Sequence, residues 1–252
     1  MQAEERQFLI EQHLQKVEFA SLEELSEKVD VSVSTVRRDL TLLETKGNIR
    51  RTHGGARLVT PKSDEFAFTA RDTHQLSEKD AIGQAAAELV QPNQGVIVDA
   101  GTTAYHVAKH LGGKASHIIT NSLPVANHFG SDNSVEVLVT GGVIYPRLGV
   151  LVGPLAVESL SKMHADVAIM SGGGITMDGI TNSHALLIDI QRAMLQSAQR
   201  IIFCLDHTKF NRRSVSPLCE LDAIDTIVTD AQAPADLVGQ LKQTNTQVVI
   251  AS

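Results

Sequence analysis

The sequence predicts a two-part α/β chain: a small, mostly helical N-terminal domain, then a larger domain with a largely parallel sheet covered by helices on both faces. Two patterns support this prediction. Apolar residues recur at helical spacing through residues 3–45. From Lys79 onward, short apolar runs alternate with helical patterns, as expected of βαβ units. A chain of 252 residues can give each part its own core. We expect domains over 1–57 and 79–252, with a linker over 58–78.

Two short helices open the chain. Residues 3–17 carry a single apolar stripe, and Ser21–Glu24 has the form of a capping box that starts a second helix. A tight turn through Asp30 and Val31 follows that helix. The apolar side chains that these two helices should bury are Ile10, Leu14, Val17, Leu22, Leu25 and Val29.

A third helix, opened by Ser32 and ended by Gly47, has one apolar face and one polar, cationic face. Its apolar residues are Val33, Val36, Leu40 and Leu43. The opposite face and its flanks hold Ser34, Thr35, Arg37, Arg38, Thr41 and Thr45. Short polar and cationic side chains suit a helix that lies in a DNA groove; the alternative is an ordinary solvated amphipathic helix.

A β-hairpin, or wing, is predicted over Asn48–Arg57, with its turn at Gly54 and Gly55. The order helix, helix, turn, helix, hairpin is that of a winged helix-turn-helix, whose third helix lies in the major groove. Within it, Arg38 and Ser34 are best placed for base edges. The predicted DNA contacts are Ser34, Thr35, Arg37, Arg38, Thr41, Arg50, Arg51 and His53.

The charge distribution fits DNA binding although the chain as a whole is acidic, with a net charge of −7. Residues 35–60 carry six basic and two acidic residues, a local charge of +4, whereas residues 1–34 carry three basic and eight acidic residues. Phosphate contact needs such a basic stripe, because the attraction acts over about 8 Å at cellular ionic strength.

The larger domain shows apolar runs of strand length separated by helical patterns. The predicted strands are 95–98, 117–119, 135–139, 167–170, 201–205, 226–228 and 248–250. The predicted helices are 103–111, 123–129, 154–163 and 185–198. This alternation predicts the parallel sheet.

Polar signatures directly follow several of these strands, where ligands gather in open parallel sheets beside helix N-termini. They are Asp99–Thr103, Thr120–Ser122, Gly141-Gly142, Gly172–Gly174 and Asp206–Lys209. Each signature alone is more often a turn or a cap. Together, on successive strand ends, they predict a pocket. Amide N–H groups, hydroxyls and one lysine suit a small phosphorylated polyol or sugar.

Two sets of motifs indicate a family. Ser32–Leu40 reads Ser-x-x-Thr-Val-Arg-Arg-Asp-Leu, and Arg51–Ala56 reads Arg-Thr-His-Gly-Gly-Ala. The larger domain adds Asp-x-Gly-Thr-Thr from Asp99, Thr-Asn-Ser from Thr120 and Asp-His-Thr-Lys-Phe from Asp206. With these motifs the chain resembles the DeoR family of bacterial transcriptional regulators. The resemblance implies an effector domain similar in fold to ribose-5-phosphate isomerase, which senses phosphorylated sugars or their derivatives.

The resemblance also implies a set of effector contacts. Carried over by position, they are Asp99, Gly101, Thr102, Thr103, Asn121, Ser122, Gly141, Gly142 and Lys209. At one position the chain departs from the pattern: many family members have a lysine where this chain has Gln191, next to Arg192. A neutral amide would weaken a second electrostatic contact to phosphate, so a neutral or differently charged effector is an alternative.

Other classes of protein find little support in the sequence. The longest apolar runs are far short of the roughly 20 residues of a membrane helix, and no secretory signal is recognisable, so we expect a cytoplasmic protein. The histidines and cysteines lack metal-ligand spacing. We therefore expect no bound metal and no cofactor. His184 and His207 are the two histidines expected to border the pocket.

The predicted function is a ligand-responsive DNA-binding regulator, most simply a repressor. It should act on double-stranded DNA as a homo-oligomer, because one reading helix makes few base contacts. The alternative is a sugar-phosphate isomerase with an N-terminal appendage. Its general base would be a carboxylate such as Asp99 or Asp206, because Met170–Gly174 contains none. A protein-interaction module without DNA binding would leave the basic stripe unexplained.

Overall fold

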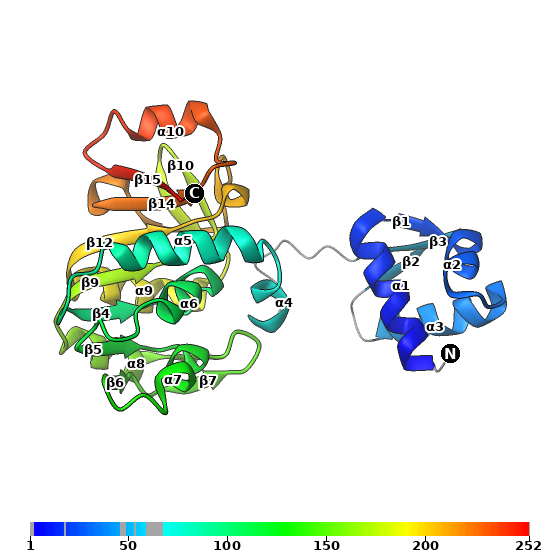
Figure 1. Cartoon of the computed structure of the whole chain (residues 1–252), viewed down its shortest axis with the longest axis horizontal. Coiled ribbons are helices and arrows are strands. Elements are labelled where there is room, and N and C mark those ends of the chain that lie inside the picture. The colour runs from blue at the N-terminus through cyan, green and yellow to red at the C-terminus, as the bar shows by residue number, and fades with distance from the viewer. Residues whose placement is uncertain (1–2, 18, 46–48, 53, 59–67, 252) are drawn as a thin grey trace. The chain divides into compact units, whose positions relative to one another are not determined.

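The computed structural model consists of two compact units, Met1–Ser63 and Asp64–Ser252, each with its own hydrophobic core (Figure 1). We call them the first and the second unit. The structure describes the whole chain except residues 1–2, 18, 46–48, 53, 59–67 and 252. Gly47, predicted to end the third helix, and His53, a predicted DNA contact, therefore lie outside the described residues.

The first unit has three helices and a three-stranded antiparallel sheet of order β1-β3-β2. The helices are α1 (Ala3–Val17), α2 (Leu22–Val29) and α3 (Val33–Thr45). The strands are β1 (Phe19–Ser21), β2 (Ile49–Thr52) and β3 (Gly55–Leu58). The three predicted helices and the predicted hairpin are confirmed. Strand β1, which pairs with β3, was not predicted, because three residues are too few to show a period of two.

The predicted core of the first unit is buried except for Val33, which is partly buried, and Val17. Val17, the last residue of α1, is 42% exposed, so the apolar stripe of α1 ends one turn earlier, at Leu14. The Ser21 hydroxyl accepts the Glu24 N–H at 3.0 Å and caps α2 as predicted. The capping box is not completed, because the Glu24 carboxylate lies 2.7 Å from the His13 ring instead. Asp30 makes the turn before α3 with a left-handed backbone, φ 49°.

The second unit is built on a seven-stranded sheet in which all neighbouring strands are parallel. In spatial order the strands are β15 (Gln247–Ala251), β14 (Thr226–Asp230), β12 (Ala198–Cys204), β9 (Ala165–Met170), β4 (Gly95–Val98), β5 (His117–Thr120) and β6 (Glu136–Val139). Each predicted strand is present, which confirms the parallel sheet.

Helices cover both faces of this sheet, as predicted (Figure 1). One face packs against α5 (Leu76–Glu88), α6 (Thr102–Lys109) and α7 (Leu123–Phe129). The other packs against α8 (Pro154–Ser161), α9 (Ala185–Gln196) and α10 (Ala235–Leu241). Strand β4 shows why: Val96 and Val98 belong to the first of these cores and Ile97 to the second, because side chains alternate along a strand.

Several short elements of the second unit were not predicted. Helix α4 (Phe68–Asp72) and the start of α5 lie within the segment predicted as a linker, because five residues are too few to show a helical period. Residues 197 and 198 were predicted helical, but Ala198 already begins β12. Further additions are the rest of α5, helix α10, the hairpin β7 (Val143–Tyr145) and β8 (Val150–Val152), and the antiparallel sheet β10 (Gly174–Thr176), β11 (Gly179–Asn182) and β13 (Ser216–Cys219).

The strand order reverses direction between β4 and β9. From β4 the chain proceeds outward through β5 and β6, then returns to the other side of β4 and continues through β9, β12, β14 and β15. In doubly wound sheets, such a reversal opens a crevice at the carboxyl ends of the two strands, where ligands bind. The residues at that place are Asp99–Gly101, after β4, and Ser171–Gly173, after β9.

Candidate functional site

The outer face of α3 presents the predicted DNA contacts. Ser34, Arg37, Arg38 and Thr41 are exposed, while Val36, Leu40 and Leu43 on the opposite face are buried. At the N-terminus of α3 the Ser32 hydroxyl accepts the Thr35 N–H at 3.3 Å. Among the described residues, no carboxylate pairs with Arg37 or Arg38. The helix therefore offers two guanidinium groups and several hydroxyls to an external partner.

Asp39, between these arginines and the core, has a structural role. Its carboxylate is buried and accepts two hydrogen bonds from Arg6, from Nε at 2.6 Å and from Nη2 at 3.1 Å. The Gln7 amide adds a third contact at 3.4 Å. These contacts join α1 to α3. They account for a buried aspartate directly after the two exposed arginines.

Arg51 contacts α3 rather than pointing away from the first unit. Its Nε donates to Glu44 Oε2 at 2.8 Å, its backbone N–H donates to Glu44 Oε1 at 2.9 Å, and its Nη1 donates to Thr41 Oγ1 at 2.7 Å. These hydrogen bonds from Arg51 lower the pKa of the Glu44 carboxyl group. Arg51 thus joins the wing to α3 although its side chain is 44% exposed, and Arg50, the preceding residue of β2, is exposed as well.

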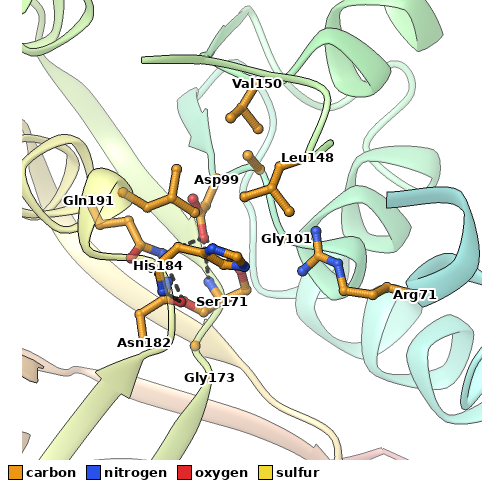
Figure 2. A pocket seen from close by; sticks show the side chains of 13 residues that line it. Arg71, Asp99, Gly101, Leu148, Val150, Ser171, Gly173, Asn182, His184 and Gln191 are labelled. Carbon is orange, nitrogen blue, oxygen red and sulfur yellow. Dashed lines mark hydrogen bonds between the residues drawn. The ribbon is translucent and has the colours of Figure 1, made fainter. Parts of the chain in front are cut away.

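A pocket lies at the reversal point of the sheet in the second unit (Figure 2). It is formed by residues from α4, the β4 and β9 ends, the β7–β8 hairpin, and the β11 end with α9. Leu148, Val150 and Leu187 supply its apolar wall. The polar side chains that line it are Arg71, Asp99, Ser171, Asn182, His184 and Gln191.

Asp99 is the centre of a hydrogen-bond network in this pocket. Its buried Oδ2 accepts the Ser171 hydroxyl at 2.6 Å, the Ser171 N–H at 3.1 Å and the Gln191 amide at 2.9 Å. The Gln191 Oε1 in turn accepts the Asn182 amide at 2.8 Å, and Asn182 Oδ1 accepts the His184 N–H at 3.3 Å. The network therefore links β4, β9, β11 and α9. Gln191, the departure from the family pattern, is one of its central members.

Gly101 is required by close packing at the pocket. A Cβ atom on this residue would lie 1.8 Å from Ser171 Oγ and 2.4 Å from Ser171 Cβ. Gly101 also begins α6, and its lack of a side chain leaves the first N–H groups of that helix without a side-chain cap. Uncapped N–H groups at a helix N-terminus favour an anionic group.

Of the nine predicted effector contacts, Asp99 and Gly101 line this pocket and the others do not. Thr102 and Thr103 are buried in the first turn of α6. Asn121 donates to the Leu151 carbonyl at 3.0 Å, and the Ser122 hydroxyl caps α7. Gly142, beside Gly141, has a φ of 118°, and a Cβ there would lie 2.7 Å from the Val152 carbonyl oxygen. Lys209 belongs to a short 3-10 helix, His207–Lys209, after β12.

Sequence reasoning missed several residues that line the pocket. Ser171 follows β9 and could have been found by the strand-end rule that identified Asp99. Asn182 was hidden because β11 was not predicted, and Arg71 because it lay in the supposed linker. Of the two histidines expected at the pocket, His184 lines it, whereas the His207 ring is 3.0 Å from the Asp230 carboxylate.

The part of the chain that the structure describes supports neither a metal site nor a reactive thiol. It contains no group of three or more His, Cys, Asp or Glu residues that could hold a metal ion. It contains no helix with the length and apolarity needed to cross a membrane. Burial raises the pKa of both thiols, that of Cys219 to about 12, so both cysteines are poor nucleophiles.

Comparison with known proteins matches both units. The DeoR-like helix-turn-helix domain matches residues 6–62, and the DeoR C terminal sensor domain matches residues 74–231. The HTH-type transcriptional regulator GolR of Listeria innocua is 34% identical over 230 residues, 90% of this chain and 91% of that protein. The HTH-type transcriptional repressor GlcR of Bacillus subtilis is 34% identical over 241 residues, 94% of this chain and 93% of that protein.

Among solved structures, ribose 5-phosphate isomerase A from Neisseria gonorrhoeae is similar over 54% of this chain and 53% of its own, with 14% identity and a TM-score of 0.39. The two domain matches cover the reading helix, the wing and the residues that line the pocket except Arg71, which lies between the matched ranges. The chain belongs to the DeoR family of DNA-binding transcriptional regulators, with an N-terminal helix-turn-helix domain and a C-terminal sensor domain for a small-molecule effector.

Proposed function

We propose that this regulator is a repressor that binds duplex DNA as a homo-oligomer and is released when a phosphorylated sugar or a derivative binds the sensor pocket. The observation that carries the proposal is the combination, in one chain, of an exposed cationic reading helix with a polar pocket at the reversal point of a parallel sheet. The relative GlcR is a transcriptional repressor, which supports the sign of regulation.

On the DNA side, the exposed residues divide by the contact that each can make. Arg38 and Ser34 lie on the outer face of α3, where a helix in the major groove meets base edges. Arg50 on the wing suits a phosphate. A single reading helix makes few base contacts, so useful specificity requires two copies on paired half-sites.

On the effector side, the pocket has two chemically different ends. Asp99, Asn182 and His184 offer a carboxylate, an amide and a ring for the hydroxyl groups of a sugar. The α6 N-terminus at Gly101 and the Arg71 guanidinium suit an anionic group. A small polyol with an anion at one end matches this division better than a wholly neutral ligand.

We do not favour catalysis in this pocket. A sugar-phosphate isomerase needs a carboxylate that can take up a proton beside the carbonyl group. Asp99 is the one acidic side chain among the described residues that line the pocket, and its Oδ2 already accepts three hydrogen bonds that position Ser171 and Gln191. An aldose–ketose conversion assay with phosphorylated sugars should therefore detect no turnover.

Fluorescence anisotropy with the full chain tests the proposal. Labelled duplexes from promoter regions should bind more tightly than random duplexes of equal length at moderate ionic strength. A panel of phosphorylated sugars, screened first by thermal shift, should contain a compound that lowers this affinity. Equal binding to all duplexes, with and without the panel, contradicts the proposal. A compound that raises the affinity instead contradicts the mechanism of release.

A further inference from the structure

Helix α4 connects the sensor pocket with the part of the chain that leads to the first unit. It is the first described element after residues 59–67, and it supplies Arg71 to the pocket. Figure 2 shows the Arg71 guanidinium turned toward Gly101, on the opposite side of the pocket from Asp99, Ser171 and His184. Among the described residues that line the pocket, Arg71 is the one permanently charged cation.

A small number of specific contacts hold α4 in place. At its N-terminus, the Phe68 N–H donates to the Arg147 carbonyl at 3.1 Å, and the Phe68 ring meets the edge of the Tyr105 ring at a centroid distance of 5.5 Å. At its C-terminus, the Asp72 carboxylate lies 3.1 Å from the buried His106 ring. The N-terminus of α4 thus contacts α6 and Arg147, the residue before Leu148 of the pocket wall. The C-terminus of α4 contacts α6 alone among these partners.

Lys79 secures the turn that follows α4. Its buried ammonium group donates to the carbonyl oxygens of Arg71 and His74, and so replaces hydrogen-bond partners that the end of a helix lacks. No side chain of α4 is buried, so the helix has no core residue of its own. The contacts described above, several polar and one aromatic, contribute to its position.

We propose that Arg71 recognises the anionic group of the effector and that this contact, through α4, couples occupancy of the pocket to DNA binding. The inference rests on the proposed function. A guanidinium group contacts a phosphate monoester through two parallel hydrogen bonds, so binding fixes the orientation of Arg71 as well as its position. Because Arg71 is a residue of α4, a ligand that holds it also holds the helix at which the second unit begins.

The coupling has a thermodynamic requirement. A ligand shifts the balance between two conformations only if it binds one more tightly than the other. The contact to Arg71 provides that difference if α4 is placed to reach the ligand in one conformation alone. The contacts from Gly101, Asp99 and Ser171 come from the carboxyl ends of β4 and β9, and in this proposal those ends have the same position in both conformations. The strand ends thus supply affinity, and Arg71 supplies both affinity and coupling.

Ligand binding to the full chain is the first test, with a panel of probes: glucose 6-phosphate, fructose 6-phosphate, ribose 5-phosphate and glycerol 3-phosphate, each paired with its unphosphorylated counterpart. The variants are Arg71→Gln, Arg71→Lys and, as a matched control, Arg213→Gln, whose exposed side chain pairs with Asp178 outside the pocket. Calorimetry measures the Kd. Thermal unfolding of each variant checks that it is folded.

We expect Arg71→Gln to weaken binding of the preferred phosphate ester at least tenfold, Arg71→Lys to weaken it less, and Arg213→Gln to change it less than twofold. Affinity for the unphosphorylated counterpart should be the same in all four proteins. A phosphate ester that binds Arg71→Gln and the wild type equally overturns the proposal. It is also overturned if the wild type binds none of the phosphate esters, because the effector is then not of this class.

The second test measures coupling as a ratio within each protein: promoter-DNA affinity without ligand divided by affinity at saturating ligand. This ratio should be large for the wild type and Arg213→Gln and close to one for Arg71→Gln. Hydrogen exchange at residues 68–75 should slow on ligand binding in the first two proteins only. If Arg71→Gln saturated with ligand shows the same ratio as the wild type, the proposed coupling is overturned. Failure of the wild type to prefer any promoter duplex contradicts the proposed function itself, even where the ligand data agree.

Discussion

The candidate residues of the first unit lie on one exposed helix and its wing, whereas those of the second unit come from distant parts of the chain and are largely buried. Ser34 and Arg38 are neighbours within α3 and contribute little to packing. Asp99, Ser171 and Gln191 are far apart in sequence and meet in one hydrogen-bond network. A substitution in the first unit should therefore alter binding alone, while one in the pocket should also alter stability.

Two buried carboxylates show the same contrast. In the first unit, Asp39 is paired with the Arg6 guanidinium, so the ion pair is complete without a ligand. In the second unit, the Asp99 Oδ2 is satisfied by neutral donors, two from Ser171 and one from Gln191. The negative charge of Asp99 thus stays available to a ligand. A stabilising carboxylate and a ligand-binding one differ here in the charge of their partners.

The largest effect is expected from Gly101→Ala in the pocket. The new Cβ atom would overlap Ser171, so the backbone after β4 or β9 must move, at a cost of about 3 kcal/mol in the free energy of unfolding. Urea unfolding measures this change. Gly239→Ala in α10, where a Cβ would meet nothing within 4 Å, is the control and should stabilise the chain slightly. Equal stability of the two variants would contradict the expectation that substitutions in the pocket alter stability.

The next effect belongs to the first unit. Arg38→Ala should reduce discrimination between operator and altered duplexes by about 2 kcal/mol, because a bidentate contact to a base edge is lost. Its free energy of unfolding should change by less than about 0.5 kcal/mol, since the side chain is exposed. Arg50→Ala should instead weaken binding to all duplexes alike. Identical effects of the two variants in a competition assay would contradict this division of contacts.

Much of the fold was predictable because its signals are local. The helical period of α3 and the apolar runs of the seven sheet strands can be read directly, and the turn at Gly54 and Gly55 has a characteristic sequence. What escaped prediction was short or irregular. Helix α4 has five residues and β1 has three, and neither length can show a period.

The pocket was only partly predictable because its residues converge through tertiary structure. The strand-end rule identified Asp99 and Gly101 correctly as neighbours of the crevice, but it cannot tell which strand ends lie at the reversal point. Asn121, Ser122, Gly141 and Gly142 follow β5 and β6, farther from the reversal. Arg71 enters from a segment without any pattern, and no sequence signal marked it.

A smaller expected effect is a pH dependence of stability that originates in the second unit, at Lys79. Burial lowers the pKa of Lys79 to about 8, against 10.5 for an ordinary lysine. Between these values the folded state has lost the proton and the unfolded state retains it, so stability rises with pH across that window, by about 1–2 kcal/mol after solvent screening. Below pH 8 Lys79 is charged in both states and the burial penalty is fully present.

Chemical unfolding between pH 7.5 and 10.5 tests this assignment. Lys79→Met should lack the rise in stability that the wild type shows. Lys162→Met, which removes an exposed lysine that follows α8 and pairs with Glu158, should retain it. If both variants follow the wild-type profile, the buried ammonium does not carry a lowered pKa, and its role in securing the turn after α4 would need another explanation.

The smallest expected effect concerns Arg51, a predicted DNA contact of the first unit that is hydrogen-bonded to Glu44 within that unit. Glu44 holds Arg51 against α3, so Glu44→Ala should release the guanidinium for a phosphate contact. Each added phosphate contact steepens the dependence of log K on log salt concentration by about 0.9, so the slope should change by about that amount. Glu27→Ala removes the same charge from an exposed position of α2 and controls for general electrostatics. Equal slopes in the two variants would contradict the idea that Glu44 withholds Arg51 from a phosphate contact.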